Sequence, residues 1–508
     1  MASSKTAAAT AVEHVDVLIV GAGLSGIGSA CHLTRRCPGR SFAIVEAREA
    51  MGGTWDLFRY PGIRSDSDMF TLGYSFKPWE EAKAIADGPS ILSYIRETAR
   101  ENGIEDHVRY GQRVVHAEWS SEQASWTVEM EHAQDGRRTQ ISCGFLLGCT
   151  GYYRYDEGYT PDFAGIERFR GRVVHPQHWP EDLDFDGKRV VVIGSGATAV
   201  TLIPSMADRT AHITMLQRSP SYLLSMPGDD PIANLARRVL PRHAAYALIR
   251  WKNVMLMLLV FQVSRRWPKF MRGLLRRNAE RNLPAGYDID RHFKPQYEPW
   301  DQRMCLVPDN DMFDAIAAGK ASVVTDQIET FTENGIRLAS GAELEADIVI
   351  TATGLNLIAL GGMSLSVDGV DVELGQTVAY KGMMVSGVPN LAITFGYTNA
   401  SWTLKGDLTG EYVCRLLNHM RAHGYSHCTP REPGADVARE PFLDLTSGYV
   451  QRAMERFPKQ GERAPWRLNQ NYPLDVRALR FGALENEGIE FTRAGTPRAT
   501  PAPERLAA

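Results

Sequence analysis

The chain has 508 residues, of which 44% are hydrophobic and 23% charged, as in an ordinary globular protein with room for two or three domains. Its formal net charge of -4 argues against a general nucleic-acid-binding protein. The seven cysteines include no C-x-x-C pair, which argues against a disulfide framework or a metal site and indicates a reducing, cytoplasmic environment.

Both ends of the chain are expected to be disordered. Residues 1–14 are small and polar and lack the apolar stretch of a secretory signal peptide. Residues 494–508 are rich in proline and alanine. Segments of this kind bury too little apolar surface to offset the entropy lost on ordering them.

A nucleotide-binding turn follows the first predicted strand. The apolar run 15–20 leads into G-A-G-L-S-G at 21–26 and then into a helical stretch. In this context the glycines let the backbone approach a pyrophosphate at the start of the helix. The next strand, 41–45, ends in Glu46, which is placed to bond an adenosine ribose. The pattern predicts a dinucleotide but does not by itself choose between FAD and NAD.

A second nucleotide turn follows a later strand. The run 189–193 leads into G-S-G-A-T-A at 194–199, where alanine is an accepted variant of the last glycine. The next strand ends in Gln217-Arg218-Ser219 and not in an acid. A carboxylate there would repel a 2′-phosphate, whereas Arg218 can bind one and Ser219 can donate a hydrogen bond. We therefore predict NADPH and not NADH; the alternative is an ordinary surface arginine.

The segment from about 230 to 298 is predicted to be a helical insertion with an unusual charge. Between Arg237 and Arg281 it holds twelve Lys or Arg residues and one acid, Glu280. Its longest apolar run, 254–263, is too short to span a bilayer. We expect a helical lobe with a solvated basic face. The alternative is a helix lying on a membrane surface, because basic and apolar residues alternate at roughly helical spacing.

The segment from Phe169 to Pro180 reads F-x-G-x-x-x-H-x-x-x-W-P and lies just before the second glycine turn. Its wording and placement resemble the fingerprint of the flavin-dependent Baeyer–Villiger monooxygenases. Three further segments resemble motifs of this family: G-G-T-W at 52–55, R-Y-P-G-I-R-S-D at 59–66, and P-W-D-Q-R-M-C at 299–305. The likeness runs from about residue 15 to about residue 472. Its wording is most similar to the branch that includes the ethionamide-activating monooxygenases of mycobacteria and the long-chain alkane-degradation monooxygenases.

The resemblance implies an α/β fold with two Rossmann-like dinucleotide-binding domains. Two apolar runs that end in Thr-Gly, 145–151 and 347–354, resemble the strands that cross between such domains. The expected FAD-binding domain is therefore discontinuous, at 15–151 and 355–493. The NADPH-binding domain, 152–354, would be inserted in it and would carry the helical insertion.

The resemblance also implies the cofactor contacts. The residues expected to contact FAD are Gly21, Gly23, Ser25, Gly26, Glu46, Thr54, Trp55, Asp56, Leu57, Arg64, Ser65, Asp66 and Val114. Those expected to contact NADPH are Gly194, Ser195, Gly196, Ala197, Thr198, Ala199, Val200, Arg218 and Ser219. Many relatives have lysine where this chain has Gln302, so Arg218 would carry more of the preference for NADPH.

The oxygen chemistry follows from the same resemblance. In the family, reduced flavin adds O2 at C4a, and the deprotonated peroxide attacks a substrate carbonyl. Arg303 would stabilise the negative oxygen of peroxide and adduct, because a guanidinium does not lose its proton. Asp66 would orient and balance Arg303. The alternatives are an ordinary salt bridge for Arg303 and a turn cap for Asp66. His175 is expected to act in a hinge or conformational relay between domains, with direct chemistry as its alternative.

We therefore expect an NADPH- and O2-dependent enzyme that converts ketones to esters or lactones, with sulfoxidation as a side activity. The alternative is a flavin hydroxylase or S/N-oxygenase that acts on long chains or soft nucleophiles. An NADPH reductase and a membrane-attached NADPH-binding protein fit the motifs less well. The expected partners are a ketone or sulfide and O2. The physiological substrate and the oligomeric state are left open.

Overall fold

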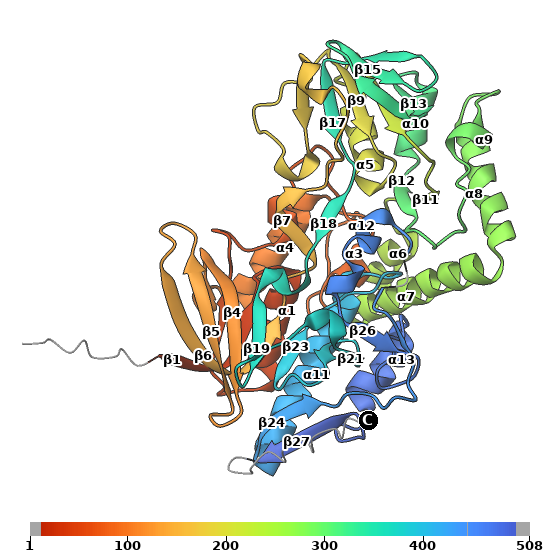
Figure 1. Cartoon of the computed structure of the whole chain (residues 1–508). Coiled ribbons are helices and arrows are strands. Elements are labelled where there is room, and N and C mark those ends of the chain that lie inside the picture. Colours follow the sequence, from red (N-terminus) through yellow and green to blue (C-terminus); the bar gives the residue numbers. More distant parts are fainter. Residues whose placement is uncertain (1–11, 444, 494–508) are drawn as a thin grey trace, which may run out of the picture.

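The computed structural model describes residues 12–443 and 445–493, and two sheets organise them (Figure 1). The larger sheet has nine strands in the order β20-β19-β4-β5-β6-β1-β2-β3, with β23 paired to β6. Its strands are β1 (Glu13–Val20), β2 (Phe42–Val45), β3 (Val108–Arg109), β4 (Gln112–Ser120), β5 (Ser125–His132), β6 (Arg138–Gly148), β19 (Ser364–Val367), β20 (Val370–Asp371) and β23 (Leu391–Ile393). Residues 13 and 14 of the expected N-terminal tail thus belong to β1, whereas residues 1–11 and 494–508 lie outside the described part.

The smaller sheet has five parallel strands in the order β13-β10-β9-β17-β8. They are β8 (Arg172–Val174), β9 (Arg189–Ile193), β10 (His212–Gln217), β13 (Ala321–Thr325) and β17 (Ile348–Thr351). All of them lie between β6 and β19 in the sequence, so the smaller unit is an insertion in the larger one. The predicted fold, two Rossmann-like units with one inserted in the other, is confirmed.

Two short strands connect the units. β7 (Tyr153–Gly158) follows β6, and β18 (Leu355–Leu357) follows β17. They pair antiparallel, with Leu355 opposite Gly158 and Leu357 opposite Tyr153. The chain therefore crosses between the sheets twice along one two-stranded ribbon, which lies between the two lobes in Figure 1.

Helices complete the two cores. On the larger sheet, α1 (Leu24–Arg36) packs against α11 (Trp402–His423), and α4 (Gly88–Glu101) lies beside α1. On the smaller sheet, α5 (Ala197–Met206) packs against α10 (Asp311–Ala317). The apolar runs that predict the strands supply the buried residues, because a parallel strand with both faces covered must be apolar throughout. Val17 and Ile19 of β1 thus share one core with Ile27 of α1 and Leu408 of α11.

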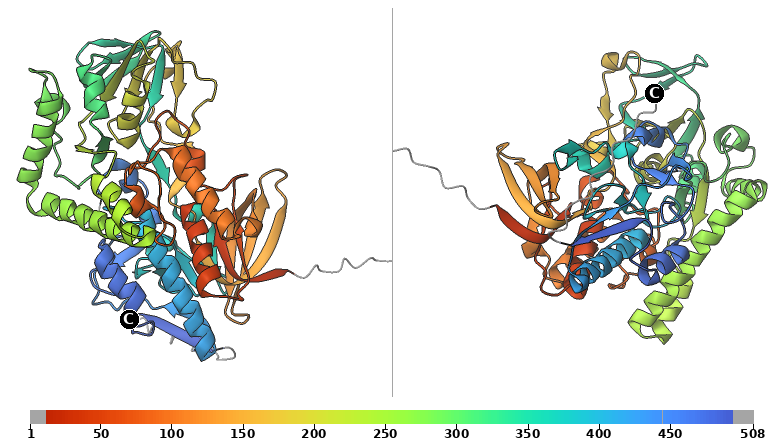
Figure 2. Two further views of the ribbon diagram at one scale, coloured as in Figure 1. Left: turned by 180° about the vertical axis from the view of Figure 1, so that it is seen from behind. Right: turned by 60° about the horizontal axis from the view of Figure 1, so that its bottom comes forward.

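The helical insertion contains four helices, and its two long helices extend to the margin of the molecule (Figure 2). They are α6 (Pro231–Val239), α7 (Arg242–Arg266), α8 (Pro268–Asn282) and α9 (Ile289–His292). The apolar part of α7 is longer than the run 254–263 suggests. By length and composition alone this helix could cross a membrane, and 33% of its most apolar 18-residue window is buried inside the protein.

The remaining elements are short. The helices are α2 (Thr54–Leu57), α3 (Met69–Leu72), α12 (Gly448–Gln451) and α13 (Tyr472–Asp475). The strands are β11 (Leu223–Met226), β12 (Cys305–Pro308), β14 (Ile328–Phe331), β15 (Gly335–Leu338), β16 (Glu343–Glu345), β21 (Ala379–Tyr380), β22 (Met384–Val385), β24 (Tyr425–Pro430), β25 (Arg439–Pro441), β26 (Lys459–Gly461) and β27 (Ile489–Arg493).

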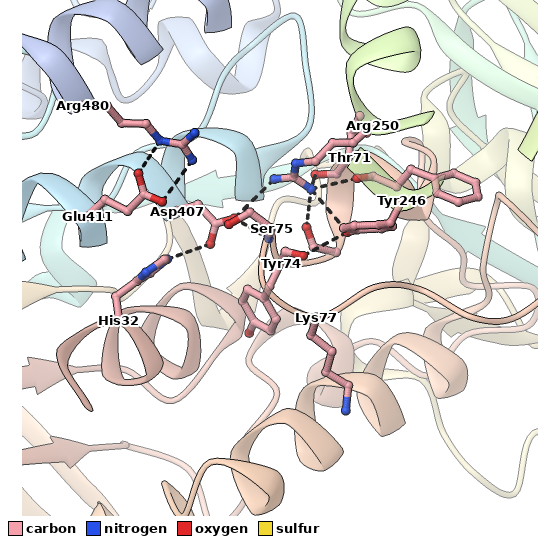
Figure 3. A network of polar contacts seen from close by, with 12 residues as sticks. His32, Thr71, Tyr74, Ser75, Lys77, Tyr246, Arg250, Asp407, Glu411 and Arg480 are labelled. Atoms are coloured by element: carbon pink, nitrogen blue, oxygen red, sulfur yellow. Dashed lines mark hydrogen bonds and ion pairs between the residues drawn. The ribbon is translucent and has the colours of Figure 1, made fainter. Parts of the chain in front are cut away.

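A buried polar network fixes the helical insertion to the larger unit (Figure 3). Asp407 of α11 lies at its centre: its carboxylate is 3.1 Å from His32 Nε2 and accepts a hydrogen bond of 2.7 Å from the Ser75 N–H. The same carboxylate pairs with the Arg250 guanidinium of α7 at 3.3 Å. Burial by itself raises the pKa of Asp407, but the hydrogen bond with His32 and the charge of Arg250 hold it below its ordinary value.

Replacing Asp407 with Asn should destabilise the protein strongly. Arg250 would keep its charge while buried, and removing one partner of a buried pair costs roughly 3–5 kcal/mol. The midpoint of thermal unfolding measures the effect. Glu333→Gln is the matched control, because Glu333 pairs with Arg170 at 2.8 Å on the surface and should change the midpoint little. Equal midpoints for the two variants would contradict the central role of Asp407.

Candidate active site

The first glycine turn joins β1 to α1 with almost no space. A Cβ on Gly21, whose φ is +103°, would lie 2.6 Å from the Cys149 carbonyl oxygen. A Cβ on Gly26 would lie 1.9 Å from the Gly21 carbonyl oxygen. Gly23 immediately precedes the first residue of α1, so the turn presents the N-terminal amides of this helix. The residues present fit a pyrophosphate at the positive end of a helix.

Glu46 braces this turn. It follows β2 and is buried, and its carboxylate accepts hydrogen bonds from the Ala22 N–H at 2.7 Å and the Arg48 N–H at 3.0 Å. Burial raises the pKa of Glu46, and the two amide hydrogen bonds oppose that effect. The acid at the end of the second strand thus holds the glycine turn in place, and its expected contact with ribose stays a prediction.

The G-G-T-W segment packs beside the turn and ends in α2. Asp56 of α2 is buried and pairs with Arg48 at 2.8 Å and Arg96 at 3.1 Å. Its carboxylate is therefore engaged by arginines, which leaves the backbone of α2 as the part suited to a cofactor. The Thr54 hydroxyl lies 3.2 Å from the Tyr155 hydroxyl of β7. Trp55 and Leu57 are partly buried on the same short helix, and Val114 is buried on β4.

The second glycine turn packs against neighbouring backbone at Gly194 and is open to solvent space at Gly196. A Cβ on Gly194, whose φ is +137°, would lie 2.3 Å from the Ala352 carbonyl oxygen. A Cβ on Gly196 would meet no atom within 4 Å, so space lies in front of α5. The Ser195 hydroxyl bonds the Ser219 carbonyl at 3.1 Å. This turn also fits a phosphate group at a helix N-terminus.

The remaining residues expected at the second site divide by exposure. Ala197 is exposed and Thr198 half-buried at the start of α5, whereas Ala199 and Val200 are fully buried and can offer a nucleotide only their backbone. Arg218 and Ser219 are exposed directly after β10. The side chain of Arg218 is thus free to reach a ligand beside the turn.

Asp66 and Arg303 come together at the junction of the two units. Asp66 precedes α3 of the larger unit. Arg303 precedes β12 of the smaller, inserted unit. Their side chains form an ion pair of 3.0 Å and are 39% and 34% exposed. The charge of Asp66 raises the pKa of Arg303 above its ordinary value, against the opposing effect of burial. The pair therefore presents a permanent cation to a partly open space.

Three aromatic residues outside the predicted site lie near the first turn and Arg303. The Tyr152 and Tyr153 hydroxyls are 3.2 Å apart, and the Tyr152 ring lies 5.1 Å from the Trp402 ring. Trp402 donates a hydrogen bond of 2.8 Å to the Ser25 hydroxyl of the first turn. The charge of Arg303 lowers the pKa of Tyr153, although burial is the larger effect and raises it. The position of Tyr152 directly after a Thr-Gly strand end is the sequence signal that could have indicated it.

The segment between α2 and α3 also fixes the inserted unit. A Cβ on Gly62, whose φ is +73°, would lie 1.7 Å from the Ser205 hydroxyl of α5. Arg64 forms an ion pair with Asp311 of α10. Ser65 is buried, and its hydroxyl donates to the Ser67 carbonyl at 2.6 Å. Arg64 and Ser65 thus have structural partners, and their expected contact with FAD stays a prediction.

His175 lies at the crossing between the units. Its Nε2 is 3.2 Å from the Gly354 carbonyl oxygen, and its Nδ1 accepts a hydrogen bond of 3.2 Å from the Gln177 N–H. A Cβ on Gly158 of β7 would lie 2.0 Å from the imidazole ring, so the ring packs on the backbone there. Among residues 12–443 and 445–493, no hydrogen bond or ion pair joins it to Asp66 or Arg303. This placement favours the expected role in a hinge.

Comparison with known proteins decides the family. A family model described as flavin-binding monooxygenase-like matches residues 72–395, and one for an NAD(P)-binding Rossmann-like domain matches residues 19–86. The FAD-containing monooxygenase EthA of Mycobacterium tuberculosis is 55% identical over 486 residues, which cover 96% of this chain and 99% of that protein. The chain belongs to the flavin-binding monooxygenase-like family. The expectation of a flavin-dependent monooxygenase is confirmed.

Solved structures show the same fold for this flavin monooxygenase. Cyclohexanone monooxygenase with bound ε-caprolactone has a TM-score of 0.74 at 18% identity and covers 95% of this chain and 100% of its own. OTEMO in complex with FAD and NADP has a TM-score of 0.73 at 22% identity and covers 95% and 100%. In the described part of the monooxygenase, no group of three or more His, Cys, Asp or Glu side chains is arranged to hold a metal ion.

Replacing His175 with Gln should destabilise this monooxygenase in a pH-dependent way. Burial is the main effect that lowers the pKa of His175 below its ordinary value of 6.5, so the unfolded chain takes up the proton at a higher pH than the folded chain. The stability contributed by neutral His175 is therefore present above that value and lost as the pH falls below it. The difference in thermal midpoint between wild type and variant should shrink from pH 7.5 to pH 5.5, about one unit on either side of an ordinary histidine pKa. An unchanged difference would contradict this.

Proposed function

We propose that this monooxygenase converts ketones to esters or lactones by Baeyer–Villiger oxidation, with FAD and NADPH as cofactors and O2 as co-substrate. Sulfoxidation would be a side activity. The observation that carries the proposal is the 3.0 Å pair of Asp66 and Arg303, which presents a guanidinium where the two nucleotide-binding units meet. The resemblance of the fold to cyclohexanone monooxygenase, solved with a lactone bound, supports it.

The proposed cofactor sites follow from the two glycine turns. FAD would bind residues 15–151 and 355–493, with its pyrophosphate at the start of α1. NADPH would bind residues 152–354, which include the helical insertion at about 230–298, with its pyrophosphate at the start of α5. A bound flavin would supply the transfer of electrons from NADPH to O2 and of one oxygen atom to the substrate.

Arg303 would stabilise negative charge on oxygen during the reaction. A guanidinium is permanently charged and offers several N–H donors, so it can hold an oxyanion without giving up a proton. Asp66 would orient the guanidinium through their ion pair. Tyr152 contacts Trp402 beside the first turn, and Tyr152 and Tyr153 are near enough to Arg303 to raise its pKa, so their rings would limit the access of water there.

The preference for NADPH would rest on Arg218. Its exposed side chain follows β10, at the strand end where a 2′-phosphate is recognised in such folds. Ser219 precedes a buried proline and shares a hydrogen bond with Ser195 of the turn. Gln302 adjoins Arg303 and carries no charge, so Arg218 would supply the cation. The proposed location of the enzyme is the cytoplasm, where a peripheral contact with a membrane would involve the helical insertion.

Arg303→Ala should leave flavin binding and reduction by NADPH intact and lower ester formation about 100- to 1000-fold, the usual effect of removing one oxyanion donor. Stopped-flow absorbance of the flavin measures reduction, and gas chromatography of ketone reactions measures the ester. Arg265→Ala is the control, because Arg265 pairs with Asp301 of the same segment at 2.7 Å on the surface. Wild-type ester formation by the Arg303 variant would rule out the proposed mechanism.

Arg218→Ala should raise KM for NADPH roughly 10- to 100-fold, the value of a charge-assisted hydrogen bond to a phosphate. KM for NADH should change little, because NADH has no 2′-phosphate. Steady-state oxidation of each cofactor gives both constants. Arg209→Ala is a control on the same unit, since Arg209 pairs with Asp186 at 2.7 Å away from the turn. Equal effects on the two cofactors would show that Arg218 does not bind the phosphate.

A further inference from the structure

Three helices of the insertion expose apolar stripes. The exposed side chains include Ile232, Leu235 and Val239 on α6, Leu248, Trp251, Met255 and Leu259 on α7, and Trp267, Phe270 and Leu274 at the start of α8 and along it. Their spacing of three and four residues places each set on one face of its helix. Leu259 is 59% exposed and Phe270 is 63% exposed. The helix α6 contacts α7, and α7 contacts α8, so the three stripes lie on neighbouring helices. Exposed apolar side chains gathered in this number mark an interaction surface. We call these ten residues the outer face.

The opposite side of α7 is fixed to the protein, so the outer face cannot turn inward. Arg250 donates hydrogen bonds of 2.8 Å and 2.7 Å to the Phe70 and Gly73 carbonyls and pairs with Asp407 (Figure 3). The Asn253 side-chain amide donates to the Asp68 carboxylate at 2.8 Å. A helix with a buried arginine and asparagine bonded to its own protein cannot cross a bilayer without breaking these contacts. The helix α7 can therefore lie on a membrane surface but cannot span the membrane while these contacts are kept.

Cations without an acidic partner lie on α6, at the end of α7 and along α8. Several basic side chains of the insertion are neutralised, as in the pairs Lys252–Asp230 and Arg272–Glu298. Five others have no ion pair and no side-chain hydrogen bond within residues 12–443 and 445–493: Arg238, Arg266, Lys269, Arg277 and Arg281. Four of these, Arg266 to Arg281, lie along the same stretch as Trp267, Phe270 and Leu274. An apolar stripe flanked by free cations is the pattern of a helix that lies in the interface of an anionic membrane.

We propose that the outer face docks on an anionic lipid bilayer. The apolar side chains would enter the boundary between head groups and acyl chains, and the five free cations would contact lipid phosphates. A second copy of this chain fits less well, because it would bring the same positive charges against these. The proposal goes beyond the proposed reaction and does not depend on it, since lipid binding is measured without turnover.

The inner side of the insertion connects this surface to the reaction site. The Trp300 ring lies 5.6 Å from the Phe261 ring of α7. Met271 and Leu275 of α8 share a buried cluster with Trp300 and Met304, which lie three residues before and one residue after Arg303. Docking would therefore place the segment that carries Arg303 close to the bilayer.

The test is sedimentation of the flavin-loaded full-length protein with vesicles. We expect it to sediment with vesicles of phosphatidylcholine and phosphatidylglycerol, much less with phosphatidylcholine alone, and progressively less as salt is added. The variant Leu248→Glu/Leu259→Glu/Phe270→Glu should lose most of the binding. The variant Arg266→Gln/Lys269→Gln/Arg277→Gln should bind about 100-fold more weakly, from a factor of about five for each cation.

Matched controls keep the result decisive. Val370→Glu changes an apolar side chain of β20 that is 69% exposed, and it should bind as wild type does. Flavin absorbance and the thermal midpoint show whether each variant is folded, and a variant that is unfolded is replaced by its single substitutions. Failure of wild type to bind the mixed vesicles would overturn the proposal, as would equal binding by the outer-face variants. A dimer in light scattering that Leu259→Glu abolishes, with no lipid binding, would assign the surface to contact between copies.

Discussion

The ion pair between Asp66 and Arg303 depends on how the two sheet units are held together. Its members come from segments that share no secondary structure, one before α3 and one before β12. A pair that is about one third exposed contributes little to stability, so it cannot by itself hold the units in place. Its geometry must instead be imposed by the packing around it. The position of the Arg303 guanidinium relative to Asp66 thus depends on how one unit is placed on the other.

The two chain segments that cross between the units are not stable enough by themselves to impose that position. β7 and β18 form a two-stranded ribbon, which is only marginally stable by itself. Contacts between the units therefore decide the arrangement: Gly62 against α5, Arg64 with Asp311, and Arg250 of α7 with Asp407 of α11. Gly62 excludes any side chain, and Arg64 supplies charge. The imidazole of His175 depends on staying neutral, since its Nδ1 accepts a hydrogen bond. The junction thus combines polar contacts with apolar packing, since Phe58 and Tyr60 share a buried cluster with Val174 and Ile203 of the inserted unit.

The sequence was most informative where structure is local. A strand, a glycine turn and a helix lie within one short stretch, so Gly21 and Gly194 could be placed from the pattern alone. The family resemblance added Asp66 and Arg303, which the structure brings together. Contacts between distant segments could not be read in this way. The bond from Trp402 to Ser25 and the pairing of Asp56 with Arg96 need the fold, because no spacing in the sequence relates those residues. Likewise the periodicity predicts helices in the insertion but does not say which face is covered.

The helical insertion has two sides with different contacts. Its inner residues Met271 and Leu275 pack against Met304, beside Arg303, while its outer residues face solvent. Packed side chains do not deform continuously, so a displacement of α8 must shift the segment 299–305 or open a cavity beside it. Opening a cavity costs free energy, and shifting the segment moves Arg303 relative to Asp66. Contact with the outer face would therefore reach the proposed reaction site around Arg303 through packed side chains, with the two glycine turns left unchanged.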